Sequence, residues 1–87
     1  MVDFQWNELK NARLKRVRGV SFEEITKAKL IATKGHPSRP EQQLMLFERQ
    51  GYIWVVPYVE VAEEVFFLKT LYQSRKYTRL YRQGRLT

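Results

Sequence analysis

The chain has one histidine, His36, which is the side chain best suited to moving a proton near neutral pH. It lies in residues 35–40, where a glycine and two prolines cannot continue a helix and therefore predict a loop. Functional groups often lie in loops. His36 is thus a candidate for acid–base chemistry. The alternative is a surface histidine that caps a backbone group, and the sequence leaves both interpretations open.

Three cations near the C-terminus are candidates for contacting phosphate. Arg75 and Lys76 begin the last predicted helix, where free backbone amides also attract anions. Lys69 interrupts an apolar strand between Leu68 and Thr70, so its side chain points either to solvent or into a cleft. For Arg75 and Lys76 the alternative is a helix start that is merely solvated.

The residue inventory excludes several other kinds of site. The chain has no cysteine, which removes disulfides, thiolate metal sites and a cysteine nucleophile. A small secreted domain would need such staples, so we expect a cytoplasmic protein. No dense Asp/Glu/His cluster has the spacing of metal ligands, and we therefore expect neither a two-metal nuclease nor a cofactor.

The charge is strongly positive and unevenly distributed. Sixteen Lys and Arg stand against nine Asp and Glu, for a net charge of +7, and no acidic residue follows Glu64. Such a surface suits RNA or another phosphate-bearing partner. No apolar run approaches the roughly 20 residues of a membrane span, so we expect no membrane partner. The further candidates for binding RNA are Arg16, Arg18, Tyr77, Arg79 and Arg82.

Aromatic side chains could stack on the bases of single-stranded RNA. The candidates are Trp54 and the tyrosines Tyr52, Tyr58, Tyr72, Tyr77 and Tyr81. We expect most of them to pack in the core instead. Tyr77 is the strongest candidate for stacking because it directly follows two cations.

The N-terminal third predicts a short extended arm and two helices. Phe4 and Trp6 alternate with polar residues, as in a strand. Asn7 can cap a first helix that ends near Gly19, and residues 21–24 form a capping box for a second helix. Apolar residues at helical spacing extend that second helix to Ala28. We expect the two helices to form a hairpin.

The rest of the chain predicts a sheet followed by a basic helix. Strands are predicted at residues 44–48, 52–60 and 65–72. Pro57 donates no ladder hydrogen bond, so we expect it at an edge or a bulge. Ser74 can cap a last helix that packs by its tyrosines and exposes its arginines, while Arg85, beyond Gly84, is expected at a frayed end. The fold class is α+β: a helical hairpin on a three- to four-stranded antiparallel sheet, in one domain of residues 1–87.

Two segments resemble a known toxin family. FQWNELKNARLKRVRGVSFEEI, residues 4–25, is similar to the start of BrnT-type toxins of the RelE/ParE superfamily. FLKTLYQSRKYTRLY, residues 67–81, resembles that family's last strand and its Arg-Lys-x-Thr helix. The resemblance covers most of the chain in element order and about 35 positions at the two ends.

The resemblance implies a metal-independent ribonuclease, the toxin of a type II toxin–antitoxin system. In such cleavage the ribose 2′-OH attacks the adjacent phosphate, which requires proton transfer and cations that stabilise the phosphorus centre. The residues that suit these roles are His36, Lys69, Arg75 and Lys76, of which Arg75 and Lys76 match the family motif. The implied partners are RNA, a cognate antitoxin protein and, through the antitoxin, operator DNA.

The sequence departs from the family at one position that bears on activity. BrnT proteins usually carry a Lys-His pair just before the Gly-Val step, where this chain has Val17 and Arg18. Two alternatives therefore stay open. One is a ParE-like inhibitor of DNA gyrase, and the other is a toxin relative that binds RNA without cleaving it.

Overall fold

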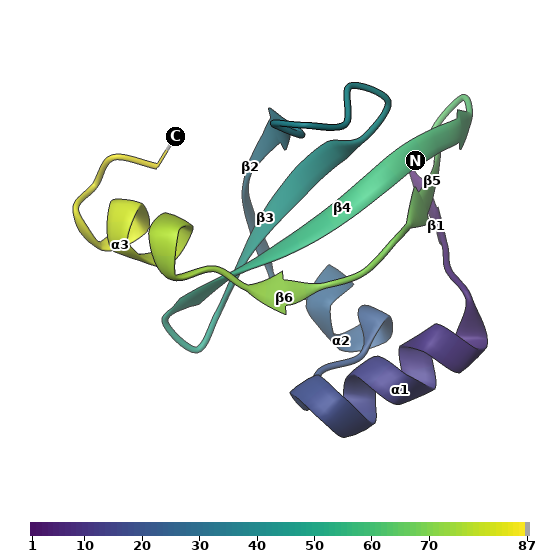
Figure 1. Cartoon of the computed structure of the whole chain (residues 1–87), viewed down its shortest axis with the longest axis horizontal. Coiled ribbons are helices and arrows are strands. Elements are labelled where there is room, and N and C mark those ends of the chain that lie inside the picture. The colour runs from purple at the N-terminus through teal and green to yellow at the C-terminus, as the bar shows by residue number, and fades with distance from the viewer. Residues whose placement is uncertain (87) are drawn as a thin grey trace.

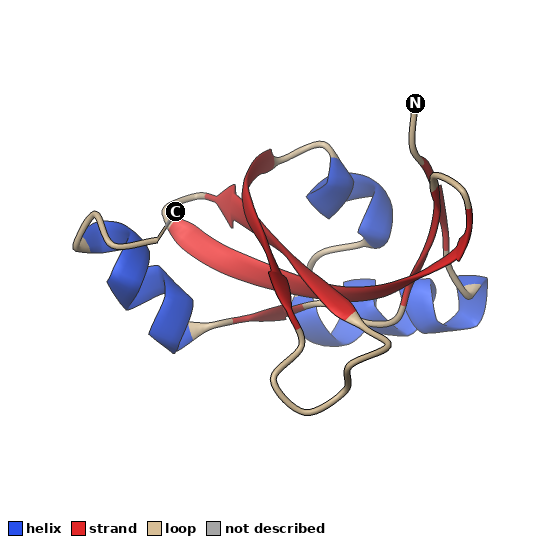
Figure 2. Cartoon of the chain, turned by 90° about the horizontal axis from the view of Figure 1, so that it is seen from above, coloured by secondary structure: helices blue, strands red, loops and turns tan. Residues whose placement is uncertain are grey.

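The computed structural model describes residues 1–86, which form three helices and a twisted sheet (Figure 1). Two of the helices lie near the N-terminus and one lies near the C-terminus, and most of the strands lie between them. Their order is β1 (Asp3–Gln5), α1 (Glu8–Arg18), α2 (Phe22–Thr26), β2 (Lys29–Gly35), β3 (Gln43–Arg49), β4 (Tyr52–Ala62), β5 (Val65–Leu68), β6 (Tyr72–Gln73) and α3 (Arg75–Arg82). Figure 2 shows α3 set apart from α1 and α2 at one end of the sheet.

The caps predicted for the first two helices are confirmed. The Asn7 side chain accepts a hydrogen bond from the Lys10 amide at the start of α1, and Gly19 ends the helix in the left-handed region with φ of 80°. Ser21 and Glu24 form the full capping box of α2. Both helix starts therefore have side-chain acceptors for amides that the helix itself leaves unpaired.

A buried asparagine joins the two helices of the hairpin. The Asn11 side chain accepts from the Phe22 amide at 2.7 Å and donates to the Glu23 carboxylate at 2.6 Å. This bond is the main reason why the pKa of Glu23 is lowered. The prediction that α2 continues to Ala28 was wrong: α2 ends at Thr26, whose hydroxyl bonds back to the Phe22 carbonyl.

The sheet is larger than predicted and is mixed. Within residues 1–86 it has six strands, in the order β1-β5-β4-β3-β2, with β6 beside the first half of β4. The N-terminal arm pairs with β5 in parallel, while the other pairings are antiparallel. The expectation of three or four antiparallel strands was wrong because β2 was not predicted, the N-terminal arm joins the sheet in parallel, and the predicted strand 65–72 is split in two.

Strand β2 is the element that the sequence pattern did not reveal. It pairs with β3 from Lys29 opposite Glu48 to Gly35 opposite Gln43, with an irregularity between Leu30 and Ala32. No residue of β2 is fully buried. An edge strand of this kind lacks the clean alternation of buried and exposed positions on which strand prediction depends.

Pro57 lies in the middle of the sheet rather than at an edge, and the strand beside it is broken. Its carbonyl accepts from the Lys69 amide at 2.8 Å, but proline has no N–H with which to return a bond to Lys69. The predicted strand 65–72 is accordingly split into β5 and β6. Tyr58 pairs with Leu68 and Val55 pairs with Tyr72. The segment from Leu68 to Tyr72 therefore advances four residues while β4 advances three, which leaves one extra residue in that segment. The expected bulge is therefore in the neighbouring segment.

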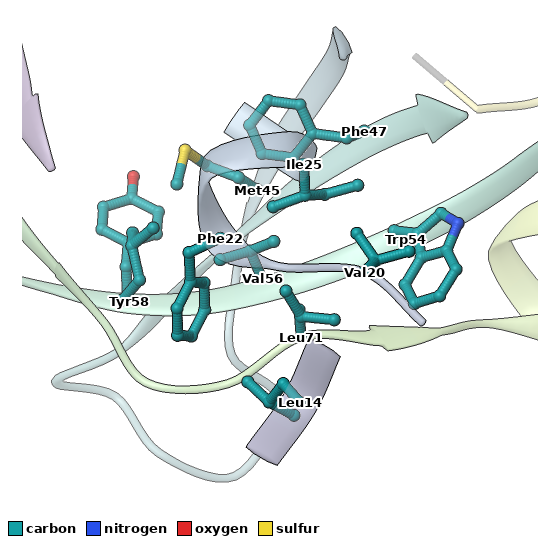
Figure 3. Close-up of a cluster of buried hydrophobic side chains, with 11 residues drawn as sticks. Leu14, Val20, Phe22, Ile25, Met45, Phe47, Trp54, Val56, Tyr58 and Leu71 are labelled. Atoms are coloured by element: carbon teal, nitrogen blue, oxygen red, sulfur yellow. The ribbon is translucent and has the colours of Figure 1, made fainter. Parts of the chain in front are cut away.

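The two faces of the sheet carry separate apolar clusters. Alternate residues of β3 and β4 point to α1 and α2 on one face and toward α3 on the other, as the pleat requires. The first cluster (Figure 3) is formed by Leu14, Val20, Phe22, Ile25, Met45, Phe47, Trp54, Val56, Tyr58, Leu68 and Leu71. The second is formed by Leu44, Leu46, Ile53, Val55 and Leu86, with Tyr77, Leu80 and Tyr81 of α3 packed against it.

Helix α3 is attached to β4 by the threonine of the Arg-Lys-x-Thr motif. The buried Thr78 hydroxyl accepts from the Ile53 amide at 2.9 Å, and the Ser74 amide donates to the Ile53 carbonyl at 2.9 Å. The amide and the carbonyl of Ile53 therefore both have hydrogen-bond partners, although β6, the neighbouring strand, ends at Gln73 and no longer pairs with this residue. As predicted, the helix packs by its tyrosines and leaves its arginines exposed.

The chain beyond α3 returns to the sheet. Gly84, with φ of 69°, lets the Arg85 amide reach the Leu80 carbonyl at 2.8 Å, and Leu86 is buried in the second cluster. The expectation of a frayed end at Arg85 was therefore wrong. None of the helices in residues 1–86 has the length and apolar character needed to cross a membrane.

We predict that Thr78→Val destabilises the protein by about 1–3 kcal/mol, because it leaves the buried Ile53 amide without an acceptor. Thr78→Ser, which keeps the hydroxyl, is the matched control and should lose much less. Urea denaturation measures both free energies of unfolding. Equal losses in the two variants would contradict the role given to the hydroxyl.

The capping box predicts a pH effect on stability. The Lys15 ammonium, followed by the Ser21 amide and hydroxyl, lowers the pKa of Glu24 from 4.5 to about 2. A lowered pKa stabilises the folded state above pH 4.5, and this contribution is lost as the pH falls through about 2. Glu24→Gln should therefore flatten the fall in stability over that range, measured by thermal melting. Glu63→Gln, at an exposed carboxylate, should keep the wild-type slope.

Candidate nucleic-acid interface

His36 follows β2 directly and closes the loop that leads to β3. Its ring Nδ1 accepts from the backbone amides of Ser38 and Arg39, both at 3.1 Å. A ring nitrogen that accepts carries no proton, so the neutral ring holds its proton on Nε2. The interpretation as a backbone cap is thus confirmed, and the group left to meet a ligand is the Nε2–H donor.

His36 and Lys69 share one hollow, as a common site requires. Lys69 reaches it because the chain leaves the sheet after Leu68, and its ammonium also lies 5.5 Å from the centroid of the Phe67 ring. The hollow has a volume of about 390 Å³. It is lined by Lys10, His36, Ser38, Arg39, Gln42, Pro57, Lys69, Thr70 and Tyr72.

Two further hollows adjoin this one through shared residues. One, of about 460 Å³, shares Lys10 and Lys69 and adds Arg13 over an apolar floor of Phe67 and Leu68. The other, of about 480 Å³, shares Tyr72 and adds Arg18, Val17, Trp54 and Gln73. No Asp or Glu lines any of the three. We call this surface the cationic track: its cations are Lys10, Arg13, Arg18, Arg39 and Lys69.

Arg18, which stands where the resemblance to BrnT-type toxins would place a histidine, makes a structural contact. Its guanidinium donates to the Leu71 carbonyl in the segment between β5 and β6, and so ties the end of α1 to the broken strand. Arg16, which was predicted to bind RNA with it, is exposed on α1 and lines none of the hollows described here. As a cation in the last turn it favours the helix dipole.

Tyr72, which the sequence offered only as one of several stacking candidates, lies in the cationic track. It lines two of the three hollows and is 37% exposed. Burial raises the pKa of Tyr72, Tyr77 raises it further, and Arg18 lowers it. The phenol is therefore a neutral proton donor at physiological pH. Apart from its aromatic ring, its sequence signal is its place between an apolar strand and the Ser74 cap.

Arg75 lies in a different hollow from His36. This hollow, the α3 hollow, has a volume of about 440 Å³ and shares no lining residue with the cationic track. Its lining residues are Tyr52, Arg75, Thr78, Arg79, Arg82 and Gln83. The predicted catalytic residues are consequently divided, with His36 and Lys69 in the track and Arg75 beside α3.

Lys76 and Tyr77 line neither surface. Lys76 is exposed, with its ammonium 5.5 Å from the centroid of the Tyr77 ring. The Tyr77 amide donates to the Ser74 hydroxyl, and its half-buried ring packs against the second apolar cluster. Among the other aromatic candidates, Trp54 and Tyr58 are buried, and Tyr81 of α3 packs against the second apolar cluster. Tyr52 and Tyr72 are the exposed ones.

The first turn of helix α3 is electrostatically unfavourable. It has no acidic residue and begins with two cations, where the helix dipole disfavours positive charge. Arg75, Arg79 and Arg82 follow at spacings that bring like charges together. Within residues 1–86 none of the three has a carboxylate within 4.0 Å. A surface of this kind is stabilised when an anion binds to it.

Metal ligands do not come together in the described chain. No three His, Cys, Asp or Glu side chains of residues 1–86 are grouped as a metal site would need. What the two surfaces share is a set of uncompensated cations beside exposed aromatic rings.

The arrangement of the elements has a counterpart among known structures. The crystal structure of the ribonuclease toxin BrnT from Brucella abortus matches 85% of this chain and 97% of its own length, with a TM-score of 0.58 and 19% sequence identity. This chain has the fold of BrnT. The resemblance carried by the two ends of the sequence is thereby confirmed at the level of the fold. No protein-family model and no curated protein matches the sequence.

On this BrnT fold the excess of cations predicts an unusual response to salt. Raising NaCl from about 0.1 M to about 1 M shortens the screening length from about 10 Å to about 3 Å and weakens the repulsion. We expect the melting temperature to rise, and to rise less in Arg79→Gln/Arg82→Gln. A melting temperature that falls with salt in the wild type would contradict this prediction.

Proposed function

We propose that this protein is the toxin of a type II toxin–antitoxin pair and that it cleaves RNA without a metal ion. One observation carries the proposal: on the fold of a ribonuclease toxin, three adjoining hollows carry five cations and no carboxylate. Because no carboxylate lines the track, no part of it repels a phosphate chain, and its cations attract such a chain along the whole length. The proposed partner is a small antitoxin that covers this track.

The hollow around His36 contains groups for each part of the reaction except a base, so we propose that the proton of the attacking 2′-OH passes to water. Lys69 and Arg39 are placed to bind the phosphate and to stabilise the charge that develops on it. Tyr72 is the proposed proton donor to the leaving 5′-oxygen, since its phenol lines the hollow and is protonated at neutral pH. Lys10 extends the cationic lining toward α1 and would hold the neighbouring phosphate.

The role of His36 depends on its loop. In the geometry described, Nε2–H can donate a hydrogen bond to a phosphate oxygen. To act as the base that takes the 2′-OH proton, the ring must first move its own proton to Nδ1. That step breaks both hydrogen bonds that Nδ1 accepts, from the backbone amides of Ser38 and Arg39. We therefore propose the donor role, and assign Arg75 and Lys76 to RNA binding rather than to the bond-breaking step.

The decisive test is cleavage of mRNA by the purified protein in EDTA. We expect cleavage by the wild type, and a loss of about 100-fold or more in kcat for Tyr72→Phe and for Lys69→Ala, because general acid catalysis and charge stabilisation each contribute at this level. Lys27→Ala removes one exposed positive charge from the end of α2 and is the matched control. Full cleavage by the Tyr72→Phe/Lys69→Ala double variant would contradict the assignment of the reaction to this hollow.

Two substitutions separate the roles of His36. If the ring donates from Nε2, His36→Gln keeps a donor and should retain more activity than His36→Ala. If the ring transfers protons, both variants should lose activity equally and the lower limb of the pH–rate profile should disappear. The same assays on Arg75→Ala should raise the half-saturating RNA concentration and leave kcat unchanged.

A second function is favoured by Arg18. The guanidinium that replaces the family histidine is bonded to a carbonyl and cannot exchange a proton. A relative of this kind would bind RNA without cleaving it. Salt-sensitive RNA binding with no cleavage and no growth arrest on expression would support this function, whereas intact RNA with inhibited DNA supercoiling would support the gyrase alternative.

A further inference from the structure

Tyr52 stands at the entrance of the α3 hollow, away from the cationic track. It is the first residue of β4, follows the turn at Gly51, and is 44% exposed despite its large ring. Its strand partner is Arg49 on β3. Neither of the two apolar clusters includes it. The ring is thus not needed for the core, and it lies beside three arginines that lack acidic partners among residues 1–86.

The Tyr52 ring is held as part of a preformed surface. The Arg82 guanidinium lies 5.2 Å from the ring centroid, and its Nη2 donates to the Gly51 carbonyl at 3.3 Å. The Gly51 amide in turn donates to the Glu48 carboxylate at 2.9 Å. Both backbone groups of Gly51 are therefore occupied, and the Glu48 carboxylate is bonded to the turn and is not part of the hollow's lining. The arrangement offers a flat ring with a cation fixed over one of its faces, so a base would stack on the opposite face.

The chemistry of this surface distinguishes a nucleotide from an acidic peptide. Carboxylates would pair with the arginines but would make no use of an exposed aromatic ring. A nucleotide uses both groups, because its base stacks on the ring and its phosphates meet the guanidinium groups. The spacing of Arg75, Arg79 and Arg82 along one side of α3 also suits successive phosphates of one strand.

We infer that the α3 hollow is a second RNA-binding site, which takes one base on Tyr52 and the flanking phosphates on Arg75, Arg79 and Arg82. It shares no lining residue with the hollow of His36 and Lys69, so it anchors the strand and takes no part in bond breaking. The inference rests on the proposed function for the identity of the ligand as RNA. It assigns to Tyr52 a role in affinity alone.

The test is binding of a fluorescent, single-stranded 2′-O-methyl RNA, followed by anisotropy. This probe lacks the attacking 2′-OH, so binding is measured without cleavage. Tyr52→Ala should weaken binding about 10-fold, the size expected for loss of one stacked base, while Tyr52→Phe should bind like the wild type. Arg79→Ala should reduce the slope of log K against log salt by about 0.7. Lys27→Ala, on the other side of the sheet, is the control for lost charge.

Each outcome bears on either the inference or the proposed function. Wild-type affinity in folded Tyr52→Ala, or an equal loss in Tyr52→Phe, would overturn the inference, as would Tyr52→Ala weakening a labelled oligoglutamate peptide more than RNA. If Tyr52→Ala melts early, the Arg79→Ala slope decides, and an unchanged slope overturns the inference. Tyr52-dependent binding by a protein that cleaves no RNA would support this site and sink only the proposed catalysis.

Discussion

The missing N–H of Pro57 is the constraint on which the candidate surface depends. A proline in a central strand cannot return the bond that the Lys69 amide makes to its carbonyl, and the neighbouring strand breaks between β5 and β6. The break leaves Lys69 outside the strands, where it lines the hollow of His36, and turns the Leu71 carbonyl toward Arg18. A single residue that makes the sheet less regular thus determines where the cations gather and how α1 is tied to the sheet.

Uncompensated charge organises the rest of the surface. The caps and bonds that hold α3 are neutral groups: the Ser74 hydroxyl, the Thr78 hydroxyl and the backbone of Ile53. The arginines of α3 and the cations of the track repel one another, although Arg82 and Arg18 also make stabilising hydrogen bonds to backbone carbonyls. Proteins that keep such clusters unpaired have a surface that an anionic partner stabilises. The antitoxin and RNA proposed here both meet that requirement, so charge alone does not separate inhibitor from substrate.

Local signals predicted the local structure well. The Asn7 cap, the Gly19 terminator and the Ser21–Glu24 capping box act within a few residues, and each was found as expected. The edge strand β2 was not predicted because it has no strongly alternating pattern, and the parallel pairing of β1 was not predicted because its partner β5 is distant in sequence. Pro57 was recognised as an irregularity, but only the sheet order decides that the irregularity falls on the opposite segment.

By itself the sequence determined the chemical character of the protein: an excess of cations without acid after Glu64, one histidine, no cysteine, and two terminal segments that resemble BrnT. The tertiary structure decided which cations act together. It brought Lys10 and Lys69 into one hollow with His36 and placed Arg75 with Tyr52 in another, although Arg75 is much nearer to Lys69 in sequence. It also turned His36 into the cap of its own loop. The physical reason is that charge and side-chain type belong to single residues, whereas a shared hollow depends on strand register and on where a ladder is interrupted.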